Sequence, residues 1–378
     1  MNGGILDRIK KIGVIRANAL GDLIFILPAL AALKRTYPDA ELVLLAREWH
    51  RTFLASRPSP VDRVIVLPPI RGLSAPDNDR SAPSQTPPDV LEGLRAERFD
   101  LLVQMHGGGE RSNPFLKEIG APTIVGLVAD GSEPLDRSIR YRYFQNETLR
   151  YLEVAALAGA APVDIMPHVA VTPDDVKEAS SALSGHGRFV VLHPGATDVR
   201  RRWAAKKFAW VGDALASRGY RVVITGDGNE RELVRAVADE MRFDAVALDG
   251  VLSLGGLAGV LKGASVVIGN DTGPLHLARA VETPTVTLYW IGNAINGGPL
   301  FHHRHRAVMS WTIACPVCSM TQIDTRCEHD PSFLDSIAPA AVLAQAEDLL
   351  ASQYGVQARG KRVANLRVSG IDATRASQ

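Results

Sequence analysis

Two blocks of short apolar runs, each run followed by a longer segment with helical periodicity, set the strongest limit on how this chain can fold. The runs are rich in β-branched residues and apolar throughout, as expected of strands buried on both faces of a sheet. In the first block we expect strands at Ile12–Ala17, Glu41–Ala46, Arg63–Leu67, Phe99–Gln104 and Thr123–Leu127. In the second block we expect them at Phe189–His193, Arg221–Thr225, Ala245–Leu248, Val266–Gly269 and Thr285–Tyr289.

Strands that alternate with helices in this way predict an α/β protein with two Rossmann-like domains, whose parallel sheets face one another across a cleft. The boundary is expected within residues 158–187, which contain several prolines and a stretch rich in Ser and Gly. This gives an N-terminal domain over residues 1–170 and a C-terminal domain over 185–352, closed by a helix at Ala338–Ser352. The polar, positively charged segment 357–378 is predicted to be a disordered tail.

The composition argues against several classes of protein. Lys and Arg total 42 against 41 Asp and Glu, so no basic field favours nucleic acid as a partner. The longest apolar run, Leu23–Leu33, contains Pro28 and is shorter than the roughly 20 residues of a membrane span. The N-terminus lacks the pattern of a signal peptide, and the three cysteines suit a reducing compartment. We therefore expect a cytoplasmic globular protein.

The most informative local motif is the turn after the expected strand Val266–Gly269. It reads Asn-Asp-Thr-Gly over residues 270–273, and Pro274 follows in the first turn of the next helix, where proline is tolerated. Free N–H groups at such a helix start bind phosphate. The carboxylate of Asp271 would repel a phosphate and is better suited to bind hydroxyl groups attached to one. The turn therefore favours a nucleotide sugar, although Asp-Thr-Gly also forms tight turns for purely conformational reasons.

Two other turns of the second block carry candidate ligands for the same molecule. After the strand that ends at His193, Gly195 allows the backbone to approach a phosphate, and Thr197 offers a hydroxyl donor. The basic run 200–207 would ordinarily be a solvated face, but its position favours contact between an arginine and a pyrophosphate. Glu230 is either a favourable charge in the first turn of a helix or an acceptor for ribose hydroxyls. The glycine pattern of a dinucleotide-binding turn is missing, so NAD has no specific support.

In the first block, Asp22 lies where a helix is expected to begin after the strand Ile12–Ala17. It is therefore either a helix N-cap or a general base that faces the cleft. A helix N-terminus lowers the pKa of a carboxylate and would keep such a base ionised.

Three cysteines and a histidine form a candidate metal site, Cys315-x-x-Cys318 followed by Cys327-x-His329. The first pair is a good half-site for zinc or iron. The second pair is more closely spaced than usual, so buried thiols that simply pack are the alternative. The cysteines lack the signature of a catalytic nucleophile.

Taken in order, these motifs resemble those of glycosyltransferase family 9, the ADP-heptose:lipopolysaccharide heptosyltransferases, over about residues 12–350. The resemblance rests on Arg16-Ala-Asn-Ala-Leu-Gly-Asp22, His193-Pro-Gly-Ala196, Arg202-Trp203, residues 226–230 and residues 270–276. It implies a GT-B fold in which the first domain binds the acceptor and the second binds an ADP-sugar. It also implies a metal at the cysteine cluster, since some relatives carry one there.

The same resemblance implies roles for single residues. Asp22 matches the catalytic base, and Arg201 lies near the position of a lysine that contacts the donor phosphates. The implied donor-binding residues are His193, Gly195, Ala196, Thr197, Arg202, Glu230, Asp271, Thr272, Gly273 and His276. Two departures from the family pattern, Ala204 for a proline and Arg201 for a lysine, leave the phosphate ligand open between Arg201 and Arg202.

The expected function is transfer of a heptose, or a related sugar, from an ADP-sugar to a hydroxyl acceptor with inversion. The implied acceptor is the lipopolysaccharide inner core, with peripheral contact at the inner membrane. The scheme requires no cofactor, and a structural zinc or iron at the cysteine cluster is compatible with it. The alternatives are another nucleoside-diphosphate sugar, a protein or other glycan as acceptor, and a non-catalytic scaffold that binds sugar nucleotides.

Overall fold

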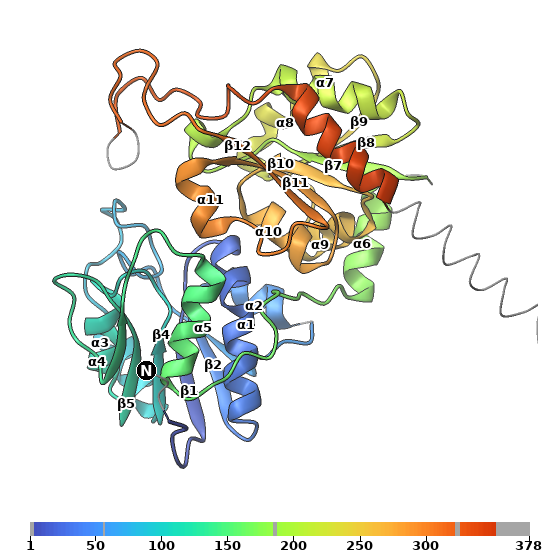
Figure 1. The fold of residues 1–378 in the computed structure, drawn as a ribbon. Coiled ribbons are helices and arrows are strands. Elements are labelled where there is room, and N and C mark those ends of the chain that lie inside the picture. Colours follow the sequence, from blue (N-terminus) through green and yellow to red (C-terminus); the bar gives the residue numbers. More distant parts are fainter. Residues whose placement is uncertain (1–3, 56, 184–186, 322–325, 353–378) are drawn as a thin grey trace, which may run out of the picture.

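The computed structural model describes residues 4–55, 57–183, 187–321 and 326–352. Within these residues the chain forms two six-stranded sheets, each covered by helices, one from each block of the sequence (Figure 1). Every pairing of neighbouring strands in both sheets is parallel. The predicted α/β class with two parallel sheets is therefore confirmed. The predicted tail 357–378 lies outside the described residues.

The first sheet has the strand order β3-β2-β1-β4-β5-β6. Its strands are β1 (Lys11–Ile15), β2 (Glu41–Ala46), β3 (Arg63–Val66), β4 (Leu101–Gln104), β5 (Thr123–Val128) and β6 (Arg137–Arg140). Its helices are α1 (Leu20–Thr36), α2 (Glu48–Ala55), α3 (Pro88–Ala96), α4 (Ser112–Ile119) and α5 (Glu147–Leu157). Buried side chains of α1 and α5 pack on one face of the sheet, and those of α3 and α4 pack on the other.

The second sheet has the order β12-β11-β10-β7-β8-β9. Its strands are β7 (Phe189–His193), β8 (Arg221–Gly226), β9 (Ala245–Asp249), β10 (Val267–Asn270), β11 (Thr285–Trp290) and β12 (His305–Ser310). The helical elements are α6 (Pro173–Leu183), η1 (Val199–Arg201), α7 (Ala205–Ala216), η2 (Gly228–Glu230), α8 (Arg231–Glu240), α9 (Leu254–Gly263), α10 (Gly273–Ala280) and α11 (Ile291–Gly297). Residues 339–352 are also helical, close to the predicted closing helix.

Both sheets repeat one topology, because each half places its first strand between its second and its fourth. The strand order therefore reverses between β1 and β4 in the first half and between β7 and β10 in the second. Open parallel sheets bind ligands at this point, outside the carboxyl ends of the strands. The fold thus directs attention to the residues that follow β1, β4, β7 and β10.

The two halves share an apolar core. One cluster of buried side chains continues from α1 and α5 of the first half to α9 and α10 of the second. Figure 1 shows α10 next to the start of α1, and α5 alongside α1. Within the described part of the chain, no helix combines the length and the apolar character needed to cross a membrane.

Helix α6 lies inside the predicted boundary segment and is joined to both halves. It packs on α9, where a Cβ added at Gly259 would collide with the carbonyl oxygen of Asp175. Arg57, which follows α2 of the first half, donates from Nη1 to Oδ2 of Asp175 at 2.9 Å. The side chains of this pair are only 3% and 7% exposed. The connection between the halves is therefore a packed helix with a buried ion pair.

Candidate functional site

The predicted site residues gather where the starts of α1 and α10 meet. A Cβ at Gly21 would lie 2.8 Å from Cδ2 of His276, and one at Gly273 would lie 3.0 Å from Cβ of Leu20. The two glycines therefore allow the two helix starts to approach. A cavity of about 270 Å³ opens at this contact. Both halves line it, through Ala19, Gly21, Asp22, Phe25, Glu147, Thr197, Arg201, Asp271, Thr272, Gly273, His276, Asn293, Asn296 and Gly297.

A second cavity of about 580 Å³ shares Ala19, Asp22 and Thr197 with the first and extends into the N-terminal half. Arg47, which follows β2, and the glycine-rich segment 107–109, which follows β4, contribute to its wall. Asp22 therefore lies where the smaller, shared cavity meets a larger one formed mostly by the first half.

Asp22 lies in the first turn of α1, and the hypothesis that it is the N-cap is wrong. The N-cap is Ala19, whose N–H donates to Oδ2 of Asp22 at 2.9 Å. The other oxygen, Oδ1, accepts from Nη2 of Arg16 at 2.5 Å. The side chain is still 29% exposed. Asp22 is thus a held carboxylate that faces the cavity, as a general base requires.

The equivalent carboxylate after β10, Asp271, is buried, with 6% of its side chain exposed. Nη1 of Arg201 lies 3.3 Å from its Oδ2. Nε2 of His276 lies 3.3 Å from its Oδ1 without forming a well-aligned hydrogen bond. Arg279 donates to Nδ1 of His276, so the proton of the neutral ring is on Nε2, toward Asp271.

The charges around Asp271 determine how these groups titrate. Burial alone would raise the pKa of Asp271, but His276, Arg201 and Arg279 outweigh it and lower that pKa. Burial, together with the charge of Arg279, lowers the pKa of His276. We therefore assign an ionised carboxylate and a neutral imidazole at neutral pH.

A third group of predicted residues follows β7 and β8. A Cβ at Gly195 would collide with Oε1 of Glu230, so a larger residue in this turn would displace the end of the Glu230 side chain. Nε2 of His193 lies 3.9 Å from Oε2 of Glu230, and Arg202 donates from Nε to the carbonyl of Ala196 at 2.8 Å. Burial raises the pKa of Glu230 and lowers that of His193 to about 4. Oε2 of Glu230 accepts from the N–H of Asp227 at 3.2 Å, and Oε1 faces the turn at Gly195.

Asn270 joins the turns after β7 and β10. Its side chain is buried and donates from Nδ2 to the carbonyl of Pro194 at 2.7 Å, while its Oδ1 accepts from the N–H of Trp203 at 3.2 Å. The structure thus brings together the predicted residues of the second half. Thr197 is exposed between the two turns and lines both cavities.

Sequence reasoning missed Glu147 and His106. Glu147 begins α5 behind the N-cap Asn146, and its Oε2 lies 3.8 Å from Nη2 of Arg16. His106 follows β4, and its Nδ1 accepts from the N–H of Ala17 at 3.4 Å. The position of His106 after a predicted strand could have revealed it. For Glu147 the sequence offers only an Asn-Glu pair, which is typical of a helix start and does not indicate a site residue.

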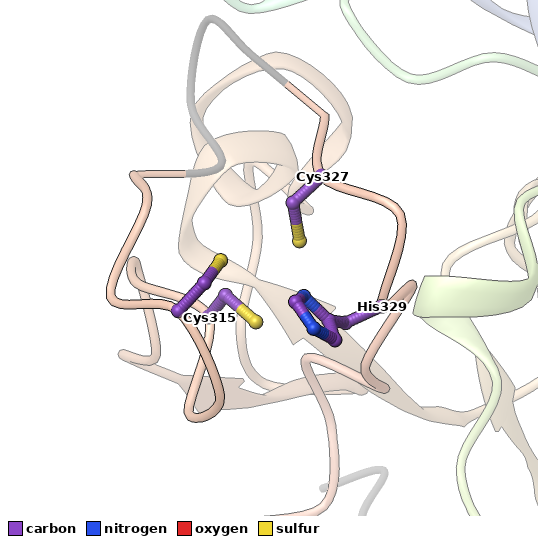
Figure 2. A group of neighbouring side chains, drawn as sticks. Cys315, Cys327 and His329 are labelled. Carbon is purple, nitrogen blue, oxygen red and sulfur yellow. The ribbon is translucent and has the colours of Figure 1, made fainter.

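The four predicted metal ligands form one group. The ligand atoms of Cys315, Cys318, Cys327 and His329 all lie within 4.8 Å of one another. Figure 2 shows Cys315, Cys327 and His329 pointing toward a common centre from two stretches of loop. Cys315 and Cys327 are buried, whereas Cys318 and His329 are exposed. Three thiols and one imidazole are a donor set that fits a tetrahedral metal ion.

Comparison with known proteins supports one family. Residues 89–323 match the family model of glycosyltransferase family 9 (heptosyltransferase). Lipopolysaccharide heptosyltransferase 3 of Escherichia coli is 24% identical over 356 residues, which cover 88% of this chain and 97% of that protein.

Two solved structures share the fold. The ADP-heptose lipopolysaccharide heptosyltransferase II of Escherichia coli matches with a TM-score of 0.69 and 19% identity, over 92% of this chain and 100% of the other. The iron-containing dodecameric glycosyltransferase TibC of enterotoxigenic Escherichia coli matches with a TM-score of 0.52 and 16% identity, over 93% of this chain and 78% of the other. The neighbours identify the two-sheet architecture as GT-B. Because the family match covers more than half of the sequence, the chain belongs to glycosyltransferase family 9 and is a glycosyltransferase.

Proposed function

We propose that the chain transfers a heptose from an ADP-heptose to a hydroxyl group of a lipopolysaccharide core, with inversion at the anomeric carbon. The observation that carries this proposal is the shared cavity, where Asp22 faces Arg201 and Asp271 from the opposite half. A base and a site for the leaving group thus lie on two sides of one space. The names of the relatives, which specify ADP-heptose and lipopolysaccharide, support this donor and acceptor.

In this mechanism Asp22 takes the proton of the acceptor hydroxyl as its oxygen attacks the anomeric carbon. The new bond forms on the face opposite the diphosphate, and the electron pair of the broken bond stays on the phosphate oxygen of ADP. Asp22 suits this step because its carboxylate is held by two hydrogen bonds and still faces the cavity. A positioned base of this kind contributes about 10²- to 10⁴-fold to a rate.

We assign the charge of the departing ADP to Arg201 and to two sets of backbone N–H groups, at 195–197 and at 272 and 273. Arg201 lines the cavity, whereas Arg202 is bound to the carbonyl of Ala196. Fixed donors at a helix start stabilise a growing negative charge without reorganisation. The ion pair with Asp271 keeps Arg201 directed at the cavity, and Oδ1 of Asp271 has no hydrogen-bond partner within the described residues.

We assign the ribose of ADP to Glu230, and the acceptor to the larger cavity of the first half. Glu230 faces the turn at Gly195, where a ribose hydroxyl would donate to Oε1, the oxygen that the N–H of Asp227 does not contact. Arg47 in the wall of the larger cavity suits an anionic acceptor. Since lipopolysaccharide is anchored in lipid, peripheral contact with the inner membrane is part of this proposal.

We further propose that Cys315, Cys318, Cys327 and His329 hold a structural zinc or iron ion. The ion would cross-link the loop around these residues, and the transfer step proposed above requires no cofactor. The name of TibC, which specifies iron, supports the second metal. Elemental analysis of purified protein should find one metal per chain, and its absorption spectrum separates iron–thiolate from zinc. Protein that is fully folded and metal-free would reject this site.

The function is tested by incubating purified protein with ADP-heptose and a core acceptor that lacks the heptose. We expect release of ADP, a product heavier by one heptose, and an inverted anomeric configuration by NMR. Binding of ADP, UDP, GDP and NAD should be measured alongside, with wild type and Glu230→Ala. Selective binding of ADP that is lost in the variant supports the donor assignment. Preference for UDP or GDP would reject ADP-heptose and leave the fold unaffected.

A further inference from the structure

Arg16 is a buried cation directly behind the shared cavity. It follows β1, and only 3% of its side chain is exposed. Nη1 donates to the carbonyl of Met105 at 2.6 Å and to the hydroxyl of Tyr151, whose ring centre lies 4.8 Å from the guanidinium carbon. Nη2 donates to Oδ1 of Asp22. The guanidinium is therefore fixed from the end of β4 and from α5 while it holds a carboxylate on α1.

The charge of Arg16 is balanced by two carboxylates that both line the cavity. Burial would lower the pKa of Arg16, but the charges of Asp22, Tyr151 and Glu147 outweigh it and raise that pKa. Glu147 is in turn paired with Arg150. Charges alternate from Asp22 through Arg16 and Glu147 to Arg150, so movement of Arg16 would leave Asp22 without its charged partner, while Glu147 would keep Arg150.

The result for Asp22 is that both of its oxygens are held. Oδ1 is fixed by Arg16, and Oδ2 is fixed by the N–H of Ala19. The hydrogen bond from Ala19 alone would leave the carboxylate of Asp22 free to rotate about Oδ2. With both bonds the plane of the carboxylate is set, and the remaining lone pairs face the cavity. A reacting group that is already oriented reacts faster than one that must be ordered during the reaction.

We propose that Arg16 is a positioning residue for the transfer reaction, which holds the carboxylate of Asp22 in one orientation, and that Glu147 and Tyr151 hold Arg16 in turn. The inference rests on the proposed role of Asp22 as the base. It adds to that role a buried partner outside the cavity wall and two residues of α5.

The other titratable groups near Asp22 do not duplicate this role. His50 on α2, His106 after β4 and His276 on α10 all interact electrostatically with Asp22. Burial lowers the pKa of His50 to about 3 and that of His106 to about 4, and it also lowers the pKa of His276. These three rings are therefore neutral near pH 7. Arg47 lines the larger cavity, and Arg201 is paired with Asp271.

The test compares the pH dependence of kcat in Arg16→Gln, Arg16→Lys and Glu147→Gln. Removal of the positive charge in Arg16→Gln should move the acid limb of the profile to higher pH. Removal of a negative charge in Glu147→Gln moves it to lower pH. Arg16→Lys keeps the charge but loses the guanidinium that contacts Asp22 and Tyr151 at the same time. The acid limb of its profile should stay near that of wild type, while kcat falls.

We expect kcat at the optimum to fall about 10- to 100-fold in Arg16→Gln, within the range of a mispositioned general base. The KM for ADP-heptose should change less than about twofold, because the donor residues belong to the other half. A change in KM alone, with the acid limb of the kcat profile unmoved, would overturn the proposal.

Arg57→Lys is the matched control, because Arg57 is equally buried and is paired with Asp175 far along the chain from Asp22. Arg57→Lys should lower stability as Arg16→Lys does, and it should leave the acid limb of the kcat profile unchanged. If Arg16→Gln does not fold, Tyr151→Phe and Glu147→Gln replace it. Unchanged kcat and an unchanged limb in both would reject the inference.

Asp22→Asn separates failure of this inference from failure of the proposed function. An active Asp22→Asn enzyme would reject Asp22 as the base, and the inference with it. An inactive Asp22→Asn enzyme, together with an Arg16→Gln enzyme of normal kcat and pH profile, would reject only the positioning role of Arg16. ADP binding should be retained in every variant of Arg16 and Glu147, as a check that the second half is folded.

Discussion

The chain uses the same strand, turn and helix start twice, after β1 and after β10, and places an aspartate in each. Asp22 is 29% exposed and is held by Arg16 and by the first turn of its own helix. Asp271 is 6% exposed and lies between Arg201 and His276. Asp22 lies within the first turn of its helix and faces the cavity, whereas Asp271 precedes the N-cap Thr272 of α10 and organises its neighbours. The position of the aspartate in the turn and the partners that each half supplies both differ.

In the first half, Arg16 and the N–H of Ala19 hold Asp22 on the side away from the cavity, so its carboxylate remains accessible. In the second half the partners Arg201 and His276 line the cavity themselves, and Asp271 lies beneath them. We therefore expect the first turn to determine the rate of proton removal and the second to determine donor binding and local stability. Each prediction below tests a part of that division.

The largest difference should appear between Asp22→Asn and Asp271→Asn. An amide at position 22 cannot accept the proton, and we expect kcat to fall about 10²- to 10⁴-fold. An amide at position 271 leaves Arg201 without its charged partner and removes the carboxylate that faces His276, which should lower the free energy of unfolding by about 1–3 kcal/mol. Steady-state kinetics and urea denaturation of both variants measure this. The division fails if Asp271→Asn lowers kcat alone and leaves stability and ADP affinity unchanged.

The second prediction concerns the two arginines that sequence reasoning could not separate. Arg201 lines the cavity, and Arg202 holds the carbonyl of Ala196. Arg201→Ala should lower kcat/KM about 10²- to 10³-fold, the loss typical of one group that stabilises a developing charge. Arg202→Ala should have a smaller effect that falls mainly on KM. Initial rates of ADP release test the order, and a larger loss of kcat in Arg202→Ala would reverse the assignment.

Among the described residues, the sequence predicted ten of the twelve strands from their apolar, β-branched runs, including the partly buried edge strands β3 and β9. It missed β6 and β12, which lie at the opposite edges of the two sheets and contain alternating or mixed polar residues. An edge strand has one neighbour and need not be apolar throughout. The fold class and the order of the site turns were therefore predictable, and the two polar edge strands were not.

From the sequence, site residues could be predicted only where they directly follow a predicted strand. Asp22, Glu230 and the turn 271–273 were found in this way. The partners from distant elements were not, because Glu147 reaches Arg16 and the site only by the packing of α5. No spacing in the sequence encodes that packing. The orientation of Asp22, in particular, depends on a contact between β1 and α5.

The third prediction tests whether the two turns work together. Gly21 and Gly273 let the starts of α1 and α10 approach, and a Cβ at Gly21 would lie 2.8 Å from Cδ2 of His276. Gly21→Ala should force the halves apart by a few tenths of an ångström and cost about 1–3 kcal/mol through overpacking. We expect kcat/KM to fall by about tenfold while ADP still binds, because the second half is intact. Gly93→Ala on α3, where a Cβ meets no atom within 4 Å, is the control.

The smallest effect should appear in the pH dependence of stability of the two donor-side carboxylates, which have opposite signs. The folded pKa of Asp271 is lowered, so its contribution is present above the unfolded pKa and is lost as the pH falls through the folded value. Burial raises the folded pKa of Glu230, so ionisation of this group costs stability as the pH rises above its unfolded value.

Glu230→Gln should therefore match wild type in acid and be more stable near pH 7, by roughly 0.5 kcal/mol, while ADP affinity falls about tenfold with loss of a charged acceptor. Asp271→Asn should show the reverse, with a deficit near neutral pH that shrinks toward acid. Thermal melts from pH 2 to pH 8, with and without ADP, test both. Equal stability of Glu230→Gln and wild type across this range would mean that the N–H of Asp227 already offsets the burial of Glu230. We expect instead that Glu230→Gln gains stability near pH 7. Glu230 is a binding residue, and its burial as a carboxylate lowers the stability of the free protein until the ligand binds to it.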